Sequence, residues 1–248
     1  MSKVRVSAVS YTNTLPFLQG VKASSVMEMI ELSVDYPAEC ARKVITNEAD
    51  LGIIPVAALL KVTDPVIITD YCIGSDGAVD SVFIFSDKPI AQIKSLRLDL
   101  QSRTSNGLAR ILLKYYWRNE VDIVWEGDAD AYVLIGDRTF GKKESVPYVY
   151  DLGHFWKELT GLPFAYAVWV ANKELPVEFV DRFNQALAEG VARPKDVIAG
   201  LPRYPNFDYE FYLTRSLDFN LDDRKRQAIA KYLELYKTLE EIEKAPIK

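Results

Sequence analysis

The sequence is poor in the residues on which several common catalytic chemistries depend. It has one histidine, His154, and two cysteines, Cys40 and Cys72, among 248 residues. A Ser-His-Asp or Cys-His triad must therefore use His154, and no pair of histidines or cysteines has the spacing of a metal site or a disulfide framework. Neither Walker-type nor dinucleotide-binding glycine patterns occur. We therefore expect neither a metal nor a cofactor.

Positive charge and long apolar runs are also scarce. The formal net charge is -5, which gives no basic stripe for general nucleic-acid binding. No apolar run is long enough to cross a bilayer, and residues 1–9 have the pattern of a β-strand and not of a signal peptide. We expect a cytoplasmic protein with no nucleic-acid or membrane partner, because the chain starts directly with this strand.

The sequence does contain alternating strand and helix patterns. Short apolar segments rich in β-formers alternate with segments whose apolar residues recur at helical spacing, for example after Pro37 and after Ser102. This alternation predicts an α/β fold. The predicted strands cover residues 4–9, 51–56, 81–86, 131–135 and 164–170.

The order of these patterns predicts two lobes. At 248 residues the chain can form two lobes of roughly 100 residues each. Two β-α modules and a helical tail indicate that the first lobe is discontinuous. We expect residues 1–85 and 169–248 to form lobe 1 and residues 86–168 to form lobe 2, with strands 81–86 and 164–170 as the crossings and a ligand cleft between the lobes.

Three polar segments lie where strands end or helices begin, at residues 10–13, 80–81 and 102–105. Ligands of α/β proteins bind beyond the carboxyl ends of strands, where helix N-termini present free N–H groups. Together the segments would offer hydroxyls, the amide of Asn13 and the guanidinium of Arg103. Such a set suits a small molecule that carries carboxylates and hydroxyls.

Each candidate also has a structural interpretation. Ser and Thr before helices are common N-caps, and Asn13 could shape a turn. Arg103 could be a surface charge. Asp137 could project into the cleft or belong to a plain Gly-Asp turn. His154 has the pattern of a surface or half-buried structural histidine and not of a general base.

Several short motifs, taken in order, resemble the chorismate dehydratase family of the futalosine route to menaquinone. They extend over almost two thirds of the chain, and their shared order is more specific than any one of them. Thr12 departs from the pattern, because leucine is expected there. The matching segments are residues 9–17, 50–56, 75–77, 81–82, 102–105, 134–137, 151–153 and 160–165, together with Trp156 and Trp169.

The resemblance implies a two-lobed fold of the type II periplasmic-binding-protein kind, used to convert chorismate to 3-[(1-carboxyvinyl)oxy]benzoate and water. It assigns Asn13 and Ser81 to active-site positions and residues 102–105 to the wall contributed by the second lobe. We expect Asn13 and Arg103 to face a common, water-poor hollow. The expected substrate-binding residues are Ser10, Tyr11, Arg103, Thr104, Ser105 and Asp137.

The sequence supplies no obvious general base, so we hypothesise that a carboxylate of the substrate accepts the proton. Two other functions stay open. The same fold serves non-catalytic binding modules for small anions, and fold alone does not decide function. The related 1,4-dihydroxy-6-naphthoate synthase has a similar scaffold, although residues 10–13 and 102–105 resemble the dehydratase more.

Overall fold

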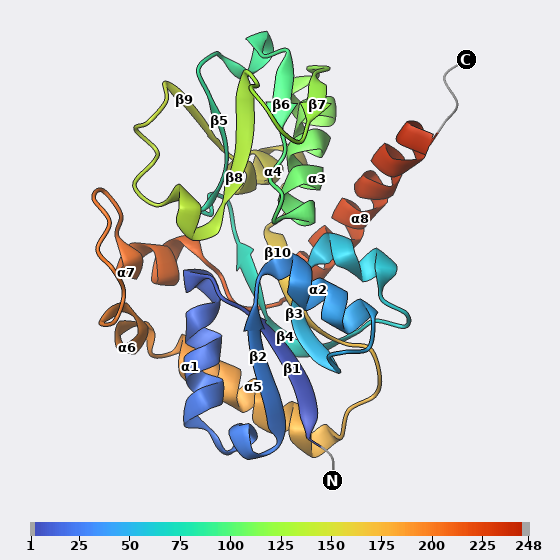
Figure 1. The fold of residues 1–248 in the computed structure, drawn as a ribbon, viewed down its shortest axis with the longest axis vertical. Helices are drawn as coiled ribbons and strands as arrows, with labels where there is room; N and C mark the ends of the chain where they lie inside the picture. Colours follow the sequence, from blue (N-terminus) through green and yellow to red (C-terminus); the bar gives the residue numbers. More distant parts are fainter. Residues whose placement is uncertain (1–2, 245–248) are drawn as a thin grey trace.

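The computed structural model describes residues 3–244, which form two lobes that are each built on a five-stranded mixed sheet (Figure 1). The predicted α/β fold is confirmed. The first sheet has the order β2-β1-β3-β10-β4, with the strands Ile30–Asp35, Val4–Val9, Leu51–Pro55, Phe164–Ala171 and Val66–Ser75. The second sheet has the order β7-β6-β8-β5-β9, with the strands Asp122–Val124, Ser95–Arg97, Ala131–Ile135, Val82–Ser86 and Tyr148–Asp151.

The centre of each sheet follows from the apolar segments of the sequence. All five residues of β3 are buried, as expected for a strand covered on both faces. It pairs in parallel with β1 and antiparallel with β10. In the second sheet β8 has the predicted bounds, and it pairs in parallel with the short strand β6, which contains the buried Leu96.

The chain crosses between the sheets twice. It leaves the first sheet at the end of β4, enters the second at β5, and returns to the first at β10. Strand pairing thus places residues 82–85 with the second sheet and 164–168 with the first, which differs from the predicted boundaries at 85/86 and 168/169. An apolar pattern identifies a strand, but it does not tell which sheet the strand joins.

The Asp151 carboxylate ties the two crossings together. It accepts the backbone N–H groups of Val79 (3.1 Å) and Asp80 (2.8 Å) in the first crossing. It also caps α4 (Leu152–Thr160), where it accepts the N–H groups of Gly153 (2.9 Å) and His154 (3.2 Å). Burial raises the pKa of this carboxyl, although the backbone hydrogen bonds oppose the effect.

Helices cover the sheets and join the lobes (Figure 1). In α1 and α5, Gly20 and Gly190 allow the two backbones to touch, because a Cβ at Gly20 would lie 1.9 Å from the carbonyl oxygen of Ala186. Among the described residues, none of the helices is long and apolar enough to cross a membrane. The helices are α1 (Leu15–Ala23), α2 (Pro37–Ile45), α3 (Arg103–Leu112), α4 (Leu152–Thr160), α5 (Val177–Val191), α6 (Pro194–Ile198), α7 (Tyr209–Phe211) and α8 (Asp223–Lys244).

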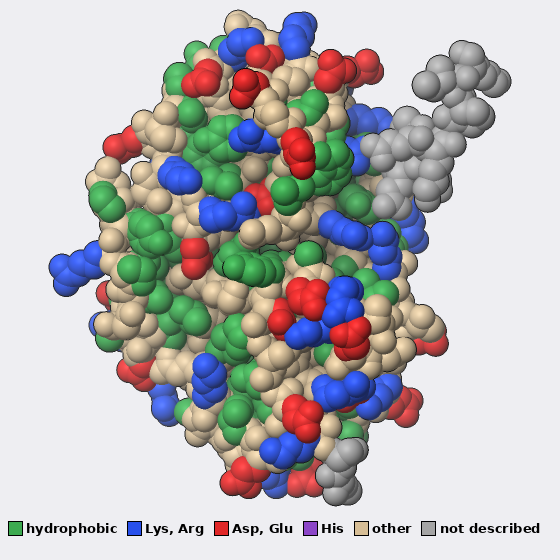
Figure 2. Space-filling view, in the orientation of Figure 1, with side chains coloured by type: hydrophobic (Ala, Val, Ile, Leu, Met, Phe, Trp, Pro, Cys, Tyr) green, Lys and Arg blue, Asp and Glu red, His purple; other side chains and the backbone are tan. Residues whose placement is uncertain are grey.

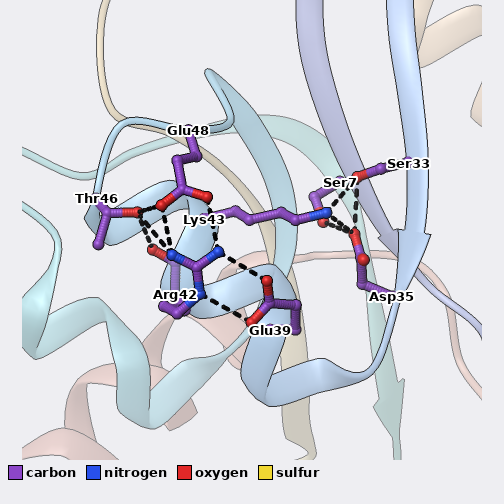
Figure 3. A network of polar contacts seen from close by, with 8 residues as sticks. All are labelled: Ser7, Ser33, Asp35, Glu39, Arg42, Lys43, Thr46 and Glu48. Carbon is purple, nitrogen blue, oxygen red and sulfur yellow. Dashed lines mark hydrogen bonds and ion pairs between the residues drawn. The ribbon is translucent and has the colours of Figure 1, made fainter.

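Helix α2 begins at Pro37, as predicted, and a polar network fixes it to the first sheet (Figure 3). Lys43 of α2 pairs with Asp35 at the end of β2, with 2.7 Å between Nζ and Oδ2. Asp35 also accepts the hydroxyls of Ser7 (2.9 Å) and Ser33 (2.7 Å). Burial alone would raise the pKa of Asp35, but these hydrogen bonds together lower it.

On its outer side α2 carries a second, solvent-exposed part of the network. Arg42 binds Glu39 (2.7 Å) and Glu48 (2.5 Å), and all three side chains are at least two-fifths exposed. Figure 2 shows basic and acidic side chains side by side over this helix, and the visible face has no broad area of a single charge. The charges on α2 therefore bind one another, which favours a structural role.

Candidate active site

A pocket lies between the two sheets, at the carboxyl ends of β1 and β3 and beside the first crossing. The space that water can reach in it is about 60 Å³. None of the described residues that line it carries a charged side chain. Its polar lining comes from Tyr11, Asn13, Thr14, Ser81, Ser102, Ser105 and Tyr166, and its apolar lining includes Val9, Ile53, Ile73, Val79, Val82 and Ile135.

Asn13 enters the pocket from the first lobe. It lies in the short 3-10 turn η1 (Thr12–Thr14), between the end of β1 and the start of α1. Its Oδ1 accepts the hydroxyl of the buried Thr14 at 3.0 Å. Because that contact occupies the oxygen end of the amide, the NH₂ end is available as a donor.

Ser81 lies directly before β5 and is 1% exposed. Its Oγ accepts the hydroxyl of Tyr212 at 2.9 Å. The preceding residue, Asp80, has a φ of +61°, a left-handed conformation that turns the chain into the new sheet. The Asp151 bonds to Val79 and Asp80 hold this turn, so the position of Ser81 is well determined.

The second lobe contributes the N-terminus of α3. Ser102 is the N-cap of this helix, and its Oγ accepts the N–H of Ser105 at 3.1 Å. The Ser102 hydroxyl also donates to Ser105 Oγ at 2.8 Å, which leaves the hydrogen of Ser105 for another acceptor. The capping interpretation is therefore confirmed for Ser102, and Ser102 and Ser105 both line the pocket as well. The free N–H groups of a helix N-terminus favour an anion.

Tyr11 closes the pocket between the lobes. Its hydroxyl donates to Gln101 of the second lobe, and its ring packs on Gly136, where a Cβ would lie 3.0 Å from the ring. Burial raises the pKa of Tyr11, although Arg138 opposes this shift. Burial also raises the pKa of Tyr166, so both phenols stay protonated at neutral pH.

The structure brings Tyr11, Asn13, Ser81 and Ser105 together, but it does not bring Arg103 to the pocket. The Arg103 side chain is exposed and lines a separate surface hollow beside α2, together with Arg42 and Lys61. The physical reason is helical geometry. Consecutive residues of a helix point about 100° apart, so Arg103 cannot face the same way as Ser102 and Ser105.

Three other predicted binding residues also lie outside the pocket lining. Ser10 is exposed, and its N–H donates to the Asp35 carbonyl at 3.0 Å. Thr104 is buried, and its Oγ1 accepts the N–H of Ala57 from the first lobe at 3.1 Å. The Asp137 carboxylate accepts both the N–H and the hydroxyl of Thr12, at 2.9 to 3.2 Å. Thr104 and Asp137 therefore hold the lobes together.

Tyr212 also belongs to this region, although no sequence motif indicates it, and it contacts Ser81 from 131 residues away. It lies in the π-helical turn η7 (Tyr212–Ser216), beyond the segments with recognisable motifs. His154, by contrast, lies at the surface, as its sequence pattern predicted. Its side chain is 51% exposed on α4, and its Nε2 is 3.4 Å from Glu158.

Known proteins resemble this chain in both sequence and fold. A sequence profile described as menaquinone biosynthesis matches residues 4–238. The chain belongs to the menaquinone biosynthesis family. A chorismate dehydratase from Thermus thermophilus is 28% identical to this chain over 191 residues, and the match covers 65% of this chain and 69% of that protein.

Solved structures extend the family assignment to the fold. Protein AF1704 from Archaeoglobus fulgidus has a TM-score of 0.73 at 16% identity, over 96% of this chain and 98% of that one. The periplasmic aliphatic sulphonate binding protein SsuA from Escherichia coli has a TM-score of 0.63 at 13% identity, over 100% of this chain and 95% of that one. This family member therefore has a periplasmic-binding-protein-like fold, as predicted.

Proposed function

We propose that this chain is a cytoplasmic chorismate dehydratase, a lyase that converts chorismate to 3-[(1-carboxyvinyl)oxy]benzoate and water. The observation that carries the proposal is the meeting of Asn13 and Ser81 with the N-terminus of α3 in one pocket without charged side chains. Membership of the menaquinone biosynthesis family supports the pathway. The dehydratase from Thermus thermophilus supports the reaction.

The chemistry needs orientation more than a strong base. Chorismate loses its ring hydroxyl and a hydrogen from the neighbouring ring carbon, and the C–H electrons complete an aromatic ring. The C–O bond breaks with its electron pair, and the proton ends on the departing oxygen, so one water balances the reaction. The amide of Asn13 and the hydroxyl of Ser81 can donate to that oxygen as its charge develops. The N-terminus of α3 and Ser105 can hold a carboxylate.

We assign the proton acceptor to a carboxylate of the substrate itself. Among the described residues that line the pocket there is neither a carboxylate nor an imidazole, and His154 is half exposed on α4. A substrate-borne base needs only to be held near the ring hydrogen, which a well-oriented bound conformation achieves. The phenols of Tyr11 and Tyr166 are poor acceptors because burial favours their protonated forms.

Substrate entry requires the walls of the pocket to move apart. An engineered apolar cavity of about 150 Å³ binds benzene, whereas the space in this pocket is about 60 Å³. Chorismate is larger than benzene, so the structure corresponds to a closed conformation. Closing around the substrate would exclude water and strengthen the hydrogen bonds inside.

The test is to mix purified protein with chorismate, follow the ultraviolet spectrum and identify the product by mass and NMR. We expect loss of the diene absorbance and formation of the enolpyruvyl benzoate. His154→Ala is the matched control and should keep turnover within about twofold, because an exposed histidine outside the pocket stabilises no developing charge.

Two results would replace the proposal. Saturable binding of chorismate without spectral change indicates a binding module. Inertness toward chorismate together with formation of 1,4-dihydroxy-6-naphthoate from its cyclic precursor indicates the related synthase.

A further inference from the structure

Tyr212 lies behind Ser81 and does not itself line the pocket. It is 1% exposed, and its ring is held by Phe140 and Phe207, each with a centroid separation of 5.4 Å. Its hydroxyl donates to Ser81 Oγ at 2.9 Å in a buried contact. The ring is therefore fixed, and its polar end is directed at one of the two residues assigned to the reaction.

The direction of this hydrogen bond determines what Ser81 can do. A serine hydroxyl has one hydrogen and two lone pairs, and we assign the Tyr212 hydroxyl as the donor to one of these lone pairs. The hydrogen of Ser81 must then point elsewhere, and Ser81 lines the pocket. Ser81 is thus set as a donor toward whatever the pocket holds.

The protonation state of Tyr212 keeps this arrangement in place. Burial raises the pKa of Tyr212. The phenol therefore stays protonated at neutral pH and remains a donor.

We infer that Tyr212 is a positioning residue that directs the Ser81 hydroxyl toward the departing oxygen of the substrate. This inference rests on the proposed function. It gives Ser81 the role of hydrogen-bond donor and not of base, and it assigns the helical C-terminal region of the chain a part in the site.

The experiment is a double-mutant cycle with Tyr212→Phe and Ser81→Ala, measured with chorismate. Tyr212→Phe alone should lower kcat by about tenfold or more and change KM by less than about threefold, because the lost bond acts on the transition state. In the Ser81→Ala background the same change should cost less than about twofold, because Tyr212 then has no hydroxyl to direct. Tyr209→Phe is the control, since the Tyr209 hydroxyl donates to the Pro202 carbonyl at 2.8 Å, away from the pocket.

The outcomes separate the inference from the proposed function. If the wild type converts chorismate but the effects of Tyr212→Phe and Ser81→Ala are additive, the inference about Tyr212 is overturned and the proposed function stands. If the wild type binds chorismate without turnover, the proposed function fails, and the same cycle measured on the Kd for chorismate decides the inference. A wild type that neither converts nor binds chorismate overturns both.

A second variant covers the case in which Tyr212→Phe does not fold. Incorporation of 3,5-difluorotyrosine at position 212 keeps the ring and the hydroxyl but makes the phenol more acidic. The kcat of the fluorinated protein should then fall at an alkaline pH at which the wild type keeps its turnover, because the donor is lost on ionisation. An unchanged kcat at that pH would overturn the inference, since a merely structural ring would not respond to this change.

Discussion

Two polar clusters in this protein differ in almost every physical respect. The network on α2 consists of charged side chains that pair with one another, from the half-buried Lys43–Asp35 pair to the exposed Arg42 (Figure 3). The pocket cluster contains the amide of Asn13 and the hydroxyls of Ser81 and Tyr212, which are neutral. Both clusters join segments distant in sequence, but of the two only the neutral one contributes side chains to the pocket between the sheets.

The difference indicates how the pocket can receive an anion without holding a fixed counter-ion. A buried cation would be costly in the empty pocket, because desolvation penalises an unpaired charge. Neutral donors and a helix N-terminus carry partial charges that are already oriented by Thr14, Tyr212 and Ser102. The α2 network can use full charges because each already has a partner near solvent.

The largest expected effect comes from changing Asn13, which tests the neutrality of the pocket. Asn13→Ala removes one donor and should lower turnover of chorismate by roughly a hundredfold. Asn13→Asp keeps the shape but places a carboxylate beside an anionic substrate, so its loss should be at least as large. Steady-state turnover measures both variants, and thermal unfolding checks that they are folded. Near-wild-type turnover of Asn13→Ala would refute the assignment.

A smaller effect is expected from the half-buried part of the α2 network. Asp35→Asn should lower the free energy of unfolding by about 1 kcal/mol at neutral pH, because the pair is partly screened by solvent. Its folded pKa is lowered, so the stabilisation exists above the unfolded pKa of about 3.9 and is lost as the pH falls through the folded value. The free energies of unfolding of the wild type and of Asp35→Asn, measured in urea, should therefore become equal in acid.

Turnover provides the control for this second change. Asp35 does not line the pocket, so Asp35→Asn should keep turnover within about twofold. A large loss of turnover with unchanged stability would show that the two clusters are not independent.

The smallest effect is expected from Arg42, at the exposed edge of the network. Exposed ion pairs are screened and contribute little, so Arg42→Ala should leave the urea midpoint nearly unchanged. Any difference from the wild type should shrink as salt is added, because screening then weakens the pairs in the wild type too. A large, salt-independent loss of stability would instead show that the Arg42 side chain contributes through packing.

The sequence was sufficient to predict the fold class and many of its elements. The helix at Pro37 and the strands β3, β8 and β10 lie close to where apolar patterns placed them. The four edge strands, β2, β4, β7 and β9, were not predicted. The periodicity of a segment depends on its own burial, whereas the sheet it joins depends on partners elsewhere in the chain.

The site was predictable only in part, for reasons of geometry. Asn13 and Ser81 follow from the motifs, and both line the pocket. Arg103 belongs to the predicted segment 102–105, but its side chain lies on the face of α3 that points away from the pocket. A motif identifies a segment without fixing the direction of each side chain. Tyr212 carries no local signal, since its role depends on the folding of η7 against Ser81.

The Asp151 carboxylate gives the two halves of the molecule a shared pivot. It holds Val79 and Asp80 on one connection and the first turn of α4 on the other. If one lobe rotates relative to the other, both connections must therefore rotate about Asp151, or the hydrogen bonds of Asp151 must break together. Ser81, the next residue after Asp80, lies beside this pivot and would move least in such a rotation. The pocket can therefore widen on the side away from Asp151 while Ser81 keeps its position.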